Sequence, residues 1–180
     1  MNCTYYHPWH TMPYGENAPA QVNAIIEITQ GSKAKYELDK QTGLLRLDRI
    51  LSSHLRYPFH YGFIPQTYCS DNDPLDILIL CSEELVPLSI VEATVLGSLH
   101  MIDNGEQDDK IIAVAANDPT MKHIKTLDDL GPDAVNNIRT FFQEYKKPEG
   151  KVVTVEAVID KGETEKLITQ SIALYKKHFR

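Results

Sequence analysis

Three carboxylates stand directly before an apolar run of strand length. Asp71, Asp73 and Asp76 lie within six residues, and the run from Ile77 to Cys81 follows without a break. A continuous apolar run of this length is typical of a strand that is buried on both faces. The acidic side chains at its mouth are therefore held on a rigid element. Like charges so crowded destabilise the fold unless a metal ion or a cationic partner neutralises them.

The ligand chemistry of this acidic cluster favours hard cations. Oxygen ligands at this density suit Mg²⁺ or Mn²⁺ better than zinc. The calcium loop of an EF-hand is excluded, because Leu75 stands at its third acidic position, Asp76 where glycine is needed and Ser82 in place of the bidentate glutamate. Taken alone, the segment is also compatible with an Asp/Asn/Pro turn whose carboxylates are simply solvated.

A second acidic segment runs from Asp103 to Lys110. It lies between two apolar runs, Ile90 to Met101 and Ile111 to Ala116, both of strand length. By itself it resembles an ordinary polar hairpin loop. Two acidic loops at strand ends in one small protein lead to the hypothesis of a shared metal site.

The whole chain limits the classes of protein to consider. Its 180 residues indicate one domain over residues 1–180. A balance of 18 basic against 25 acidic residues, net charge -7, argues against nucleic acid as a partner. No apolar stretch approaches the roughly 18–20 residues of a membrane span, and no signal-peptide pattern begins the chain. Cys3, Cys69 and Cys81 form an odd set without metal-type spacing, which favours reduced thiols in the cytoplasm.

The order of elements predicts a mainly β protein. Residues 1–21 are expected to form an irregular arm, because they contain three prolines. Helices are expected from 132 to about 145 and from 162 towards the end of the chain. Many short strands followed by two helices indicate a closed or nearly closed antiparallel barrel with flanking helices. The expected strands cover residues 22–29, 33–39, 44–47, 75–81, 88–100, 111–116 and 151–159.

Cationic and phenolic residues are interspersed among these elements. Lys35 and Glu37, two apart, share one face of a strand, and a surface ion pair would explain them as well. Arg49 follows a strand and could simply be solvated. The phenols within Tyr57–Gly62 surround a loop in which tyrosines often only pack. The lysines of Tyr145–Lys147 end a helix, where they would also complement the helix dipole.

Taken together, these segments resemble the soluble family I inorganic pyrophosphatases of the prokaryotic type. The resemblance extends over roughly residues 20 to 150 in unbroken order. Asn72 stands where the family often has glycine, and asparagine is the next-best residue for a left-handed backbone. The segments that carry the resemblance are Asp71-x-Asp73-Pro74-x-Asp76, Ile25–Ile28, Lys35–Glu37, Asp48–Arg49, Tyr57–Gly62, Asp103 with Asp108–Lys110, and Phe141–Lys146.

The resemblance implies a mainly β (α+β) fold, an OB-like five-stranded closed β-barrel with flanking α-helices. It implies hydrolysis of pyrophosphate to two phosphates with several Mg²⁺ ions, or Mn²⁺ or other divalent ions in their place. It also implies a homohexamer, by analogy with the prokaryotic branch. The arm before residue 20 and the final helix carry no catalytic motif of the family.

The resemblance also implies a role for each site residue. Asp73 would be the general base, and Tyr61 and Arg49 would join it as catalytic groups. Metal ligands would be Asp71, Asp76 and Asp108, which would hold the attacking water, with Asp103 and Glu37 for additional ions. Substrate phosphates would be held by Lys35, Arg49, Tyr61, Lys110, Tyr145 and Lys146. Glu27 and Tyr57 would line and support the cavity.

The charges of this residue set predict an order of binding. Seven carboxylates against four cations give the empty site a formal charge of -3, which repels a polyanion. Two Mg²⁺ ions would bring the charge to +1. We therefore expect metal to precede or accompany the substrate. Within this scheme, a bridging water becomes acidic, arginine binds phosphoryl oxygens bidentately and lysines act as point charges.

Two other functions are compatible with the same residues. The first is a Mg²⁺-dependent hydrolase of nucleotides or short polyphosphates, which a comparison of ATP with pyrophosphate would distinguish. The second is an OB-type binding module or cation buffer without catalysis. That module would carry aromatic platforms on a basic groove, which the net charge of -7 does not favour, and phosphate release would exclude it.

Overall fold

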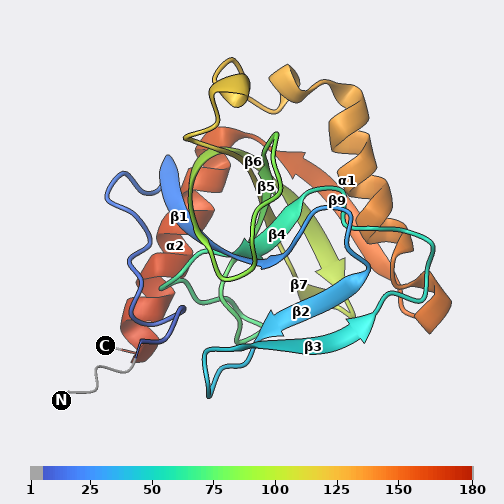
Figure 1. The fold of residues 1–180 in the computed structure, drawn as a ribbon, viewed down its shortest axis with the longest axis horizontal. Coiled ribbons are helices and arrows are strands. Elements are labelled where there is room, and N and C mark those ends of the chain that lie inside the picture. Colours follow the sequence, from blue (N-terminus) through green and yellow to red (C-terminus); the bar gives the residue numbers. More distant parts are fainter. Residues whose placement is uncertain (1–5, 180) are drawn as a thin grey trace.

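Five strands close into a ring in the computed structural model, which describes residues 6–179 (Figure 1). Neighbouring strands pair in the order β1, β4, β5, β8, β6, and β6 pairs again with β1. The closed barrel expected from the sequence is therefore confirmed. The ring is made of β1 (Gln21–Ile28), β4 (His60–Phe63), β5 (Asp76–Leu80), β8 (Lys110–Ala115) and β6 (Ile90–Asp103).

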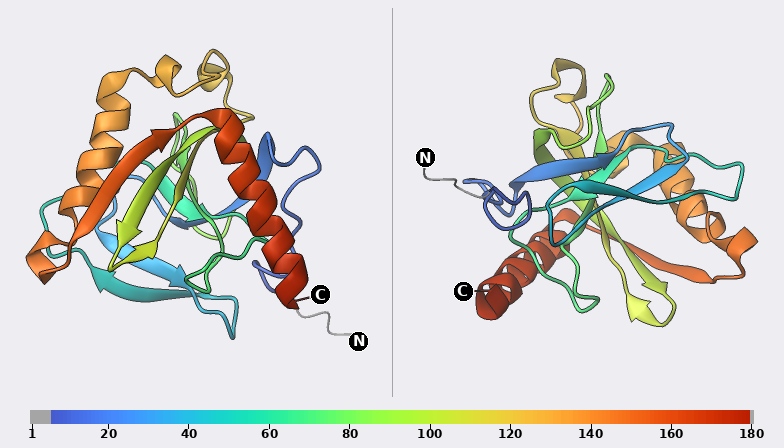
Figure 2. Two further views of the ribbon diagram at one scale, coloured as in Figure 1. Left: turned by 180° about the vertical axis from the view of Figure 1, so that it is seen from behind. Right: turned by 60° about the horizontal axis from the view of Figure 1, so that its bottom comes forward.

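Four further strands extend the ring or cover it. β2 (Ala34–Leu38) and β3 (Leu45–Ile50) form a separate hairpin. β9 (Val153–Ile159) pairs with β6, and β7 (Glu106–Gln107) closes a tight hairpin at the end of β6. Figure 2 shows β9 lying beside β6 and leading directly into the last helix.

Two α-helices lie on opposite sides of the barrel (Figures 1 and 2). They are α1 (Pro132–Glu144) and α2 (Lys161–Phe179). Three short 3₁₀ helices complete the chain: η1 (Pro119–Met121), η2 (Asp128–Leu130) and η3 (Lys147–Glu149). Both α-helices lie within one or two residues of the expected bounds.

Burial on both faces explains the unbroken apolar sequence of β5. Leu78 lies in the apolar cluster that contains Phe142 of α1. Ile77 and Ile79 lie in the cluster that contains Ile168 of α2. These three β5 side chains are fully buried. The strand therefore separates two apolar layers, and its N-terminal end is fixed from both sides.

Strand β4 was missed in the sequence, where residues 57–62 were expected to form a loop. All four residues of His60–Phe63 are buried. A Cβ atom on Gly62 would lie only 1.9 Å from the carbonyl oxygen of Ile25. Glycine is thus required for β1 and β4 to approach so closely. The aromatic and glycine residues that indicated a loop instead form a strand that packs closely against β1.

The expectation of an antiparallel barrel was wrong at one pairing. β5 and β8 run parallel, with Asp76 opposite Lys110. The reason is the connection between them, because the long strand β6 reverses the chain before β8 returns beside β5. Arg49 was expected to follow a strand, but it lies within β3 opposite Lys35.

The arm before the barrel is irregular from residue 6 to residue 20, as expected. It is nevertheless packed, because Trp9 is 2 % exposed and its indole N–H donates to the carbonyl oxygen of Thr67 at 2.8 Å. Cys69 and Cys81 are both free thiols, and Cys3 lies outside the described residues. In the described part of the chain, no helix is both long enough and apolar enough to cross a membrane.

Candidate active site

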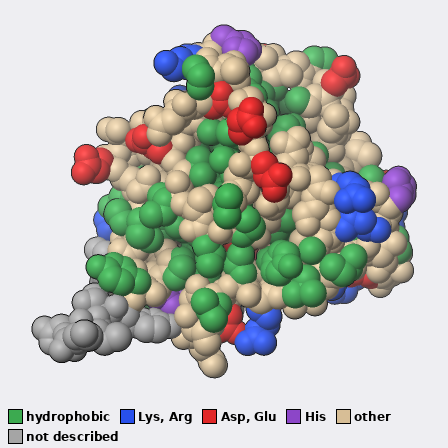
Figure 3. Space-filling model, in the orientation of Figure 1, with side chains coloured by type: hydrophobic (Ala, Val, Ile, Leu, Met, Phe, Trp, Pro, Cys, Tyr) green, Lys and Arg blue, Asp and Glu red, His purple; other side chains and the backbone are tan. Residues whose placement is uncertain are grey.

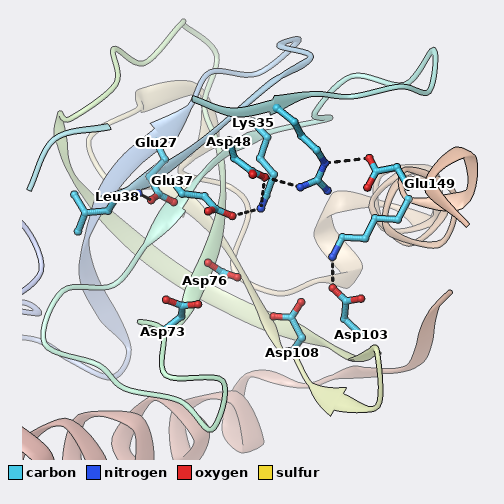
Figure 4. A network of polar contacts seen from close by, with 12 residues as sticks. Glu27, Lys35, Glu37, Leu38, Asp48, Asp73, Asp76, Asp103, Asp108 and Glu149 are labelled. Atoms are coloured by element: carbon cyan, nitrogen blue, oxygen red, sulfur yellow. Dashed lines mark hydrogen bonds and ion pairs between the residues drawn. The ribbon is translucent and has the colours of Figure 1, made fainter. Parts of the chain in front are cut away.

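One cavity of about 280 Å³ collects most of the residues singled out in the sequence. It lies where the β2–β3 hairpin faces the acidic ends of β5 and β8 (Figure 4). Its lining contains twelve of the fourteen: Glu27, Lys35, Glu37, Tyr61, Asp71, Asp73, Asp76, Asp103, Asp108, Lys110, Tyr145 and Lys146. The two exceptions are Arg49, which shares the carboxylate of Asp48 with the lining residue Lys35, and Tyr57, which is buried beside Tyr61 with ring centroids 5.5 Å apart.

The first acidic segment reaches the cavity through a tight turn. The carboxylate of Asp71 accepts a hydrogen bond from the backbone N–H of Asp73 at 3.0 Å. Asn72 between them has φ of 67°, the left-handed conformation that asparagine tolerates. Burial raises the pKa of Asp71 to about 6, against the opposing effect of that hydrogen bond. This carboxyl group therefore loses its proton at a higher pH than an ordinary aspartate.

Lys110 stands between the two acidic segments. The parallel pairing of β5 with β8 places it opposite Asp76, and its ammonium forms ion pairs with Asp76 and, at 2.5 Å, with Asp108. Lys110 is only 3 % exposed. Burial alone would lower its pKa, but the two carboxylates hold the pKa of Lys110 well above its usual value. The lysine is therefore a fixed positive charge at the base of the cavity.

A second lysine enters from the end of α1. Lys146 follows the helix and its ammonium forms an ion pair with the carboxylate of Asp103, at the end of β6. The other carboxylate oxygen of Asp103 is buried and has no hydrogen-bond partner among the described residues. Such an oxygen is costly to leave unsatisfied. Asp103 thus retains a free oxygen that a cation could occupy.

The β2–β3 hairpin supplies the opposite wall. A β-bulge places Asp48 as the extra residue opposite the junction of Lys35 and Tyr36. Its carboxylate contacts the ammonium of Lys35 at 3.3 Å and Nη1 of Arg49 at 2.5 Å. Lys35 also pairs with Glu37, as their shared strand face predicted. The bulge turns an acidic side chain between two cations that would otherwise repel one another.

Glu27 is a buried carboxyl group in the cavity wall. It accepts a hydrogen bond from the backbone N–H of Leu38 at 2.7 Å and is 7 % exposed. Burial, with the nearby charge of Asp76, raises the pKa of Glu27 to about 8. Burial also raises the pKa of Tyr61 well above its usual value, so this phenol keeps its proton and can donate it in a hydrogen bond.

Two cavity residues gave no signal in the sequence. Lys40, in the β2–β3 turn, pairs with Asp73 and donates to the carbonyl oxygen of Asn72 at 3.0 Å. Its ammonium lies 6.0 Å from the ring centroid of Trp9, which also lines the cavity. Trp9 belongs to the irregular arm and Lys40 follows a strand without any motif. Only tertiary packing reveals that they reach the site.

The cavity lining contains seven carboxylates and four lysines, so its formal charge is -3. The lysines lie between the acids. Accordingly, no group of three or more His, Cys, Asp or Glu residues in the described range is arranged as a ready metal site. Carboxylate oxygens paired with lysine ammonium groups, which divalent metal ions could replace, are the features of one class of protein. That class is the hydrolases that act on phosphate polyanions with divalent metal ions.

Comparison with known proteins identifies the family within this class. The family model for inorganic pyrophosphatase matches residues 24–176, and the chain belongs to that family. It is 48 % identical over 172 residues to the soluble inorganic pyrophosphatase of Zea mays, covering 96 % of this chain and 80 % of that one. The soluble inorganic pyrophosphatase 3 of Arabidopsis thaliana gives the same identity, matched length and coverages.

Solved structures agree with this assignment. The inorganic pyrophosphatase from Thermus thermophilus superposes with a TM-score of 0.88 at 39 % identity, covering 92 % of this chain and 97 % of that one. The enzyme from Helicobacter pylori gives 0.87 at 36 % identity, covering 92 % and 99 %. The chain is therefore an inorganic diphosphatase, which hydrolyses pyrophosphate to two phosphates, and its family depends on divalent metal ions.

Proposed function

We propose that the ions of this pyrophosphatase are Mg²⁺ and that carboxylates of the cavity hold them. The donor set fits, because every acidic group in the lining offers oxygen and one oxygen of Asp103 is buried without a partner among the described residues. The proposed ligands are Asp71, Asp76, Asp103, Asp108 and Glu37. When bound, the ions would neutralise the acidic cavity and make the attacking water more acidic.

The lysines of the cavity would change partners during this process. Lys110 now pairs with Asp76 and Asp108, and Lys146 pairs with Asp103. Once these carboxylates are engaged otherwise, both ammonium groups can donate to phosphate oxygens. The same ammonium groups thus serve two purposes, since they stabilise the empty site and then bind the substrate. The remaining proposed phosphate contacts are Lys35, Arg49, Tyr61 and Tyr145.

Asp73 is the proposed general base. It lines the cavity and its side chain is half exposed, so water can reach it. Its carboxylate pairs with Lys40 of the facing hairpin, whereas Asp76 and Asp108 share the buried Lys110. A carboxylate that is not fully engaged as a ligand can accept the proton of the attacking water. Glu27 and Tyr57 would shape the wall around it.

The observation that carries the proposal is the convergence of seven carboxylates and four lysines on one cavity of about 280 Å³. This volume lies just below the roughly 300–1,000 Å³ that is usual for ligand pockets, which favours a small inorganic substrate over a nucleotide. Phosphate release from pyrophosphate should require Mg²⁺, cease with excess chelator and exceed release from ATP by orders of magnitude. Equal rates with pyrophosphate and ATP would contradict the proposed selectivity.

We also propose that the enzyme works in the cytoplasm as a homohexamer. Its described cysteines are free thiols, as a reducing compartment predicts. Large apolar side chains remain exposed, among them Val86, Ile90 and Val152, and Figure 3 shows apolar side chains gathered in the lower half of one face. Such patches favour association. Light scattering should give six times the mass of the chain, and a monomer mass would contradict the assembly.

A further inference from the structure

Arg49 lies outside the cavity lining, and two carboxylates from distant parts of the chain hold its guanidinium. Nη1 donates to Asp48 at 2.5 Å, and Nε donates to Glu149 at 3.0 Å. Figure 4 shows Asp48 on the hairpin side and Glu149 on the side of the segment that follows α1. Glu149 has no role in the site as proposed above.

The third nitrogen of the guanidinium is left without a partner. Nη2 of Arg49 is buried and makes no hydrogen bond within the described residues. A buried donor of a charged group is costly to leave unpaired. Arg49 shares the carboxylate of Asp48 with the ammonium of Lys35, which lines the cavity, so its guanidinium lies near the cavity wall. Nη2 is therefore the nitrogen of Arg49 that no described protein group satisfies, and a phosphate oxygen would supply the missing acceptor.

The Glu149 carboxylate fixes this arrangement more specifically than Asp48 does. Asp48 is shared with the ammonium of Lys35 at 3.3 Å, whereas the contact to Nε orients the plane of the guanidinium. The side chains of Arg49 and Glu149 are 25 % and 18 % exposed, so solvent weakens their attraction only in part. Without Glu149, the long arginine stem could rotate towards solvent, and binding a phosphate would then require ordering it again.

The position of Glu149 in the chain adds a second consequence. It ends the 3₁₀ helix η3, which begins directly after Lys146. Gly150 follows in the left-handed conformation, with φ of 71°, and turns the chain towards β9. The Arg49–Glu149 ion pair therefore ties the β3 strand to the segment that presents Lys146. The ion pair thus holds Arg49 in place relative to the segment that carries Lys146.

We infer that Glu149 is a positioning residue for the substrate phosphate, acting through Arg49. This inference rests on the proposed role of Arg49 as a phosphate contact. It requires no contact between Glu149 and the substrate. A carboxylate that acted on the substrate directly would repel the polyanion, so its removal should strengthen substrate binding. The inference predicts instead that removing Glu149 weakens substrate binding.

The test uses the variants Glu149→Ala, Glu149→Gln, Arg49→Lys and the double variant Glu149→Ala with Arg49→Lys. Steady-state kinetics with pyrophosphate at saturating Mg²⁺ should show KM raised about tenfold in Glu149→Ala, with kcat changed less than about threefold. The affinity for a non-hydrolysable pyrophosphate analogue should fall by the same factor. Glu149→Gln keeps an acceptor for Nε and should recover most of the loss.

The double variant separates positioning from a general structural effect. If Glu149 acts through Arg49, the double variant should bind no more weakly than Arg49→Lys alone. Glu144→Ala is the matched control, because this exposed carboxylate at the end of α1 pairs with Lys147, and it should match the wild type. Thermal unfolding of each variant checks that it is folded. If Glu149→Ala does not fold, Glu149→Gln and Glu149→Asp test the inference instead. KM should be close to the wild-type value in Glu149→Gln and raised in Glu149→Asp.

The outcomes distinguish the inference from the proposal on which it rests. If Arg49→Lys leaves both KM and analogue affinity unchanged, Arg49 is no phosphate contact and both statements fail. If Arg49→Lys weakens binding while Glu149→Ala does not, only the inference is overturned. It is equally overturned if the two effects multiply in the double variant, or if Glu149→Gln is as defective as Glu149→Ala.

Discussion

Glu27→Gln should stabilise the metal-free enzyme, and more so as the pH rises. Glu27 has a pKa of about 8 in the folded protein against a reference value of 4.5. Because the folded value is the higher one, the stability that the protonated group contributes is fully present below pH 4.5. It is lost as the pH rises towards 8. Glutamine does not titrate, and its carbonyl can still accept the hydrogen bond of Leu38.

The magnitude of this effect follows from the two pKa values. A tenfold difference in proton affinity between the folded and unfolded states corresponds to about 1.4 kcal/mol. Linkage gives a disadvantage of wild type relative to Glu27→Gln of about 1 kcal/mol at pH 5 and about 3 kcal/mol at pH 7. The variant should therefore gain about 2 kcal/mol on the wild type between these two pH values. Asp71 also has a raised pKa, but it titrates in both proteins and its contribution cancels.

Urea unfolding of both proteins with excess chelator, at one protein concentration and at several pH values from 5 to 8, measures this difference. Glu163→Gln serves as the control, since this exposed carboxylate pairs only with a neighbour on the same helix face, Lys166, among the described contacts. This control shows the effect of removing a surface carboxylate. A difference for Glu27→Gln that stays constant with pH would refute the reasoning, because burial would then not raise the pKa of Glu27.

Two further substitutions test the barrel and the exchange of lysine partners. Gly62→Ala should lower the free energy of unfolding by about 3 kcal/mol or more, since its Cβ would lie 1.9 Å from the carbonyl oxygen of Ile25. Urea unfolding measures this loss, and wild-type stability would show that β1 and β4 are not so closely packed. Lys146→Ala should raise KM for pyrophosphate while metal affinity stays the same or increases, because Asp103 loses its competing ammonium. Calorimetric titration with Mg²⁺ checks this, and a large loss of metal affinity would contradict it.

The sequence predicted most elements because their local signals agree with their burial. β5 is apolar throughout and is buried on both faces, and α1 has its apolar residues at helical spacing. β4 was missed because its signal depends on a distant strand. In the sequence, Gly62 is typical of a loop. Only the structure shows that the backbone of Ile25 occupies the space that a side chain at position 62 would need. The parallel pairing of β5 with β8 likewise depends on chain direction, which no local pattern encodes.

The candidate site was predictable to the extent that its residues belong to motifs. The acidic segments and the lysines next to them were found because charge is concentrated there. Lys40, Trp9 and Glu149 were not found, since each stands outside any motif and reaches the site through packing. Arg49 and Tyr57 were found, but the structure places them outside the cavity lining. Sequence identifies such a residue without giving its distance from the substrate.

The measurement that tests the account most directly compares Asp73→Asn with Asp71→Asn across Mg²⁺ concentration and pH. Phosphate release by Asp73→Asn should fall by roughly 10²–10⁴ in kcat, as expected for loss of an acid–base group, while pyrophosphate affinity changes much less. Its rate should rise with pH, because the attacking water must then lose its proton to solvent. Excess Mg²⁺ should largely restore Asp71→Asn and leave Asp73→Asn impaired. Equal recovery of both variants would show that Asp73 is a metal ligand and not the base.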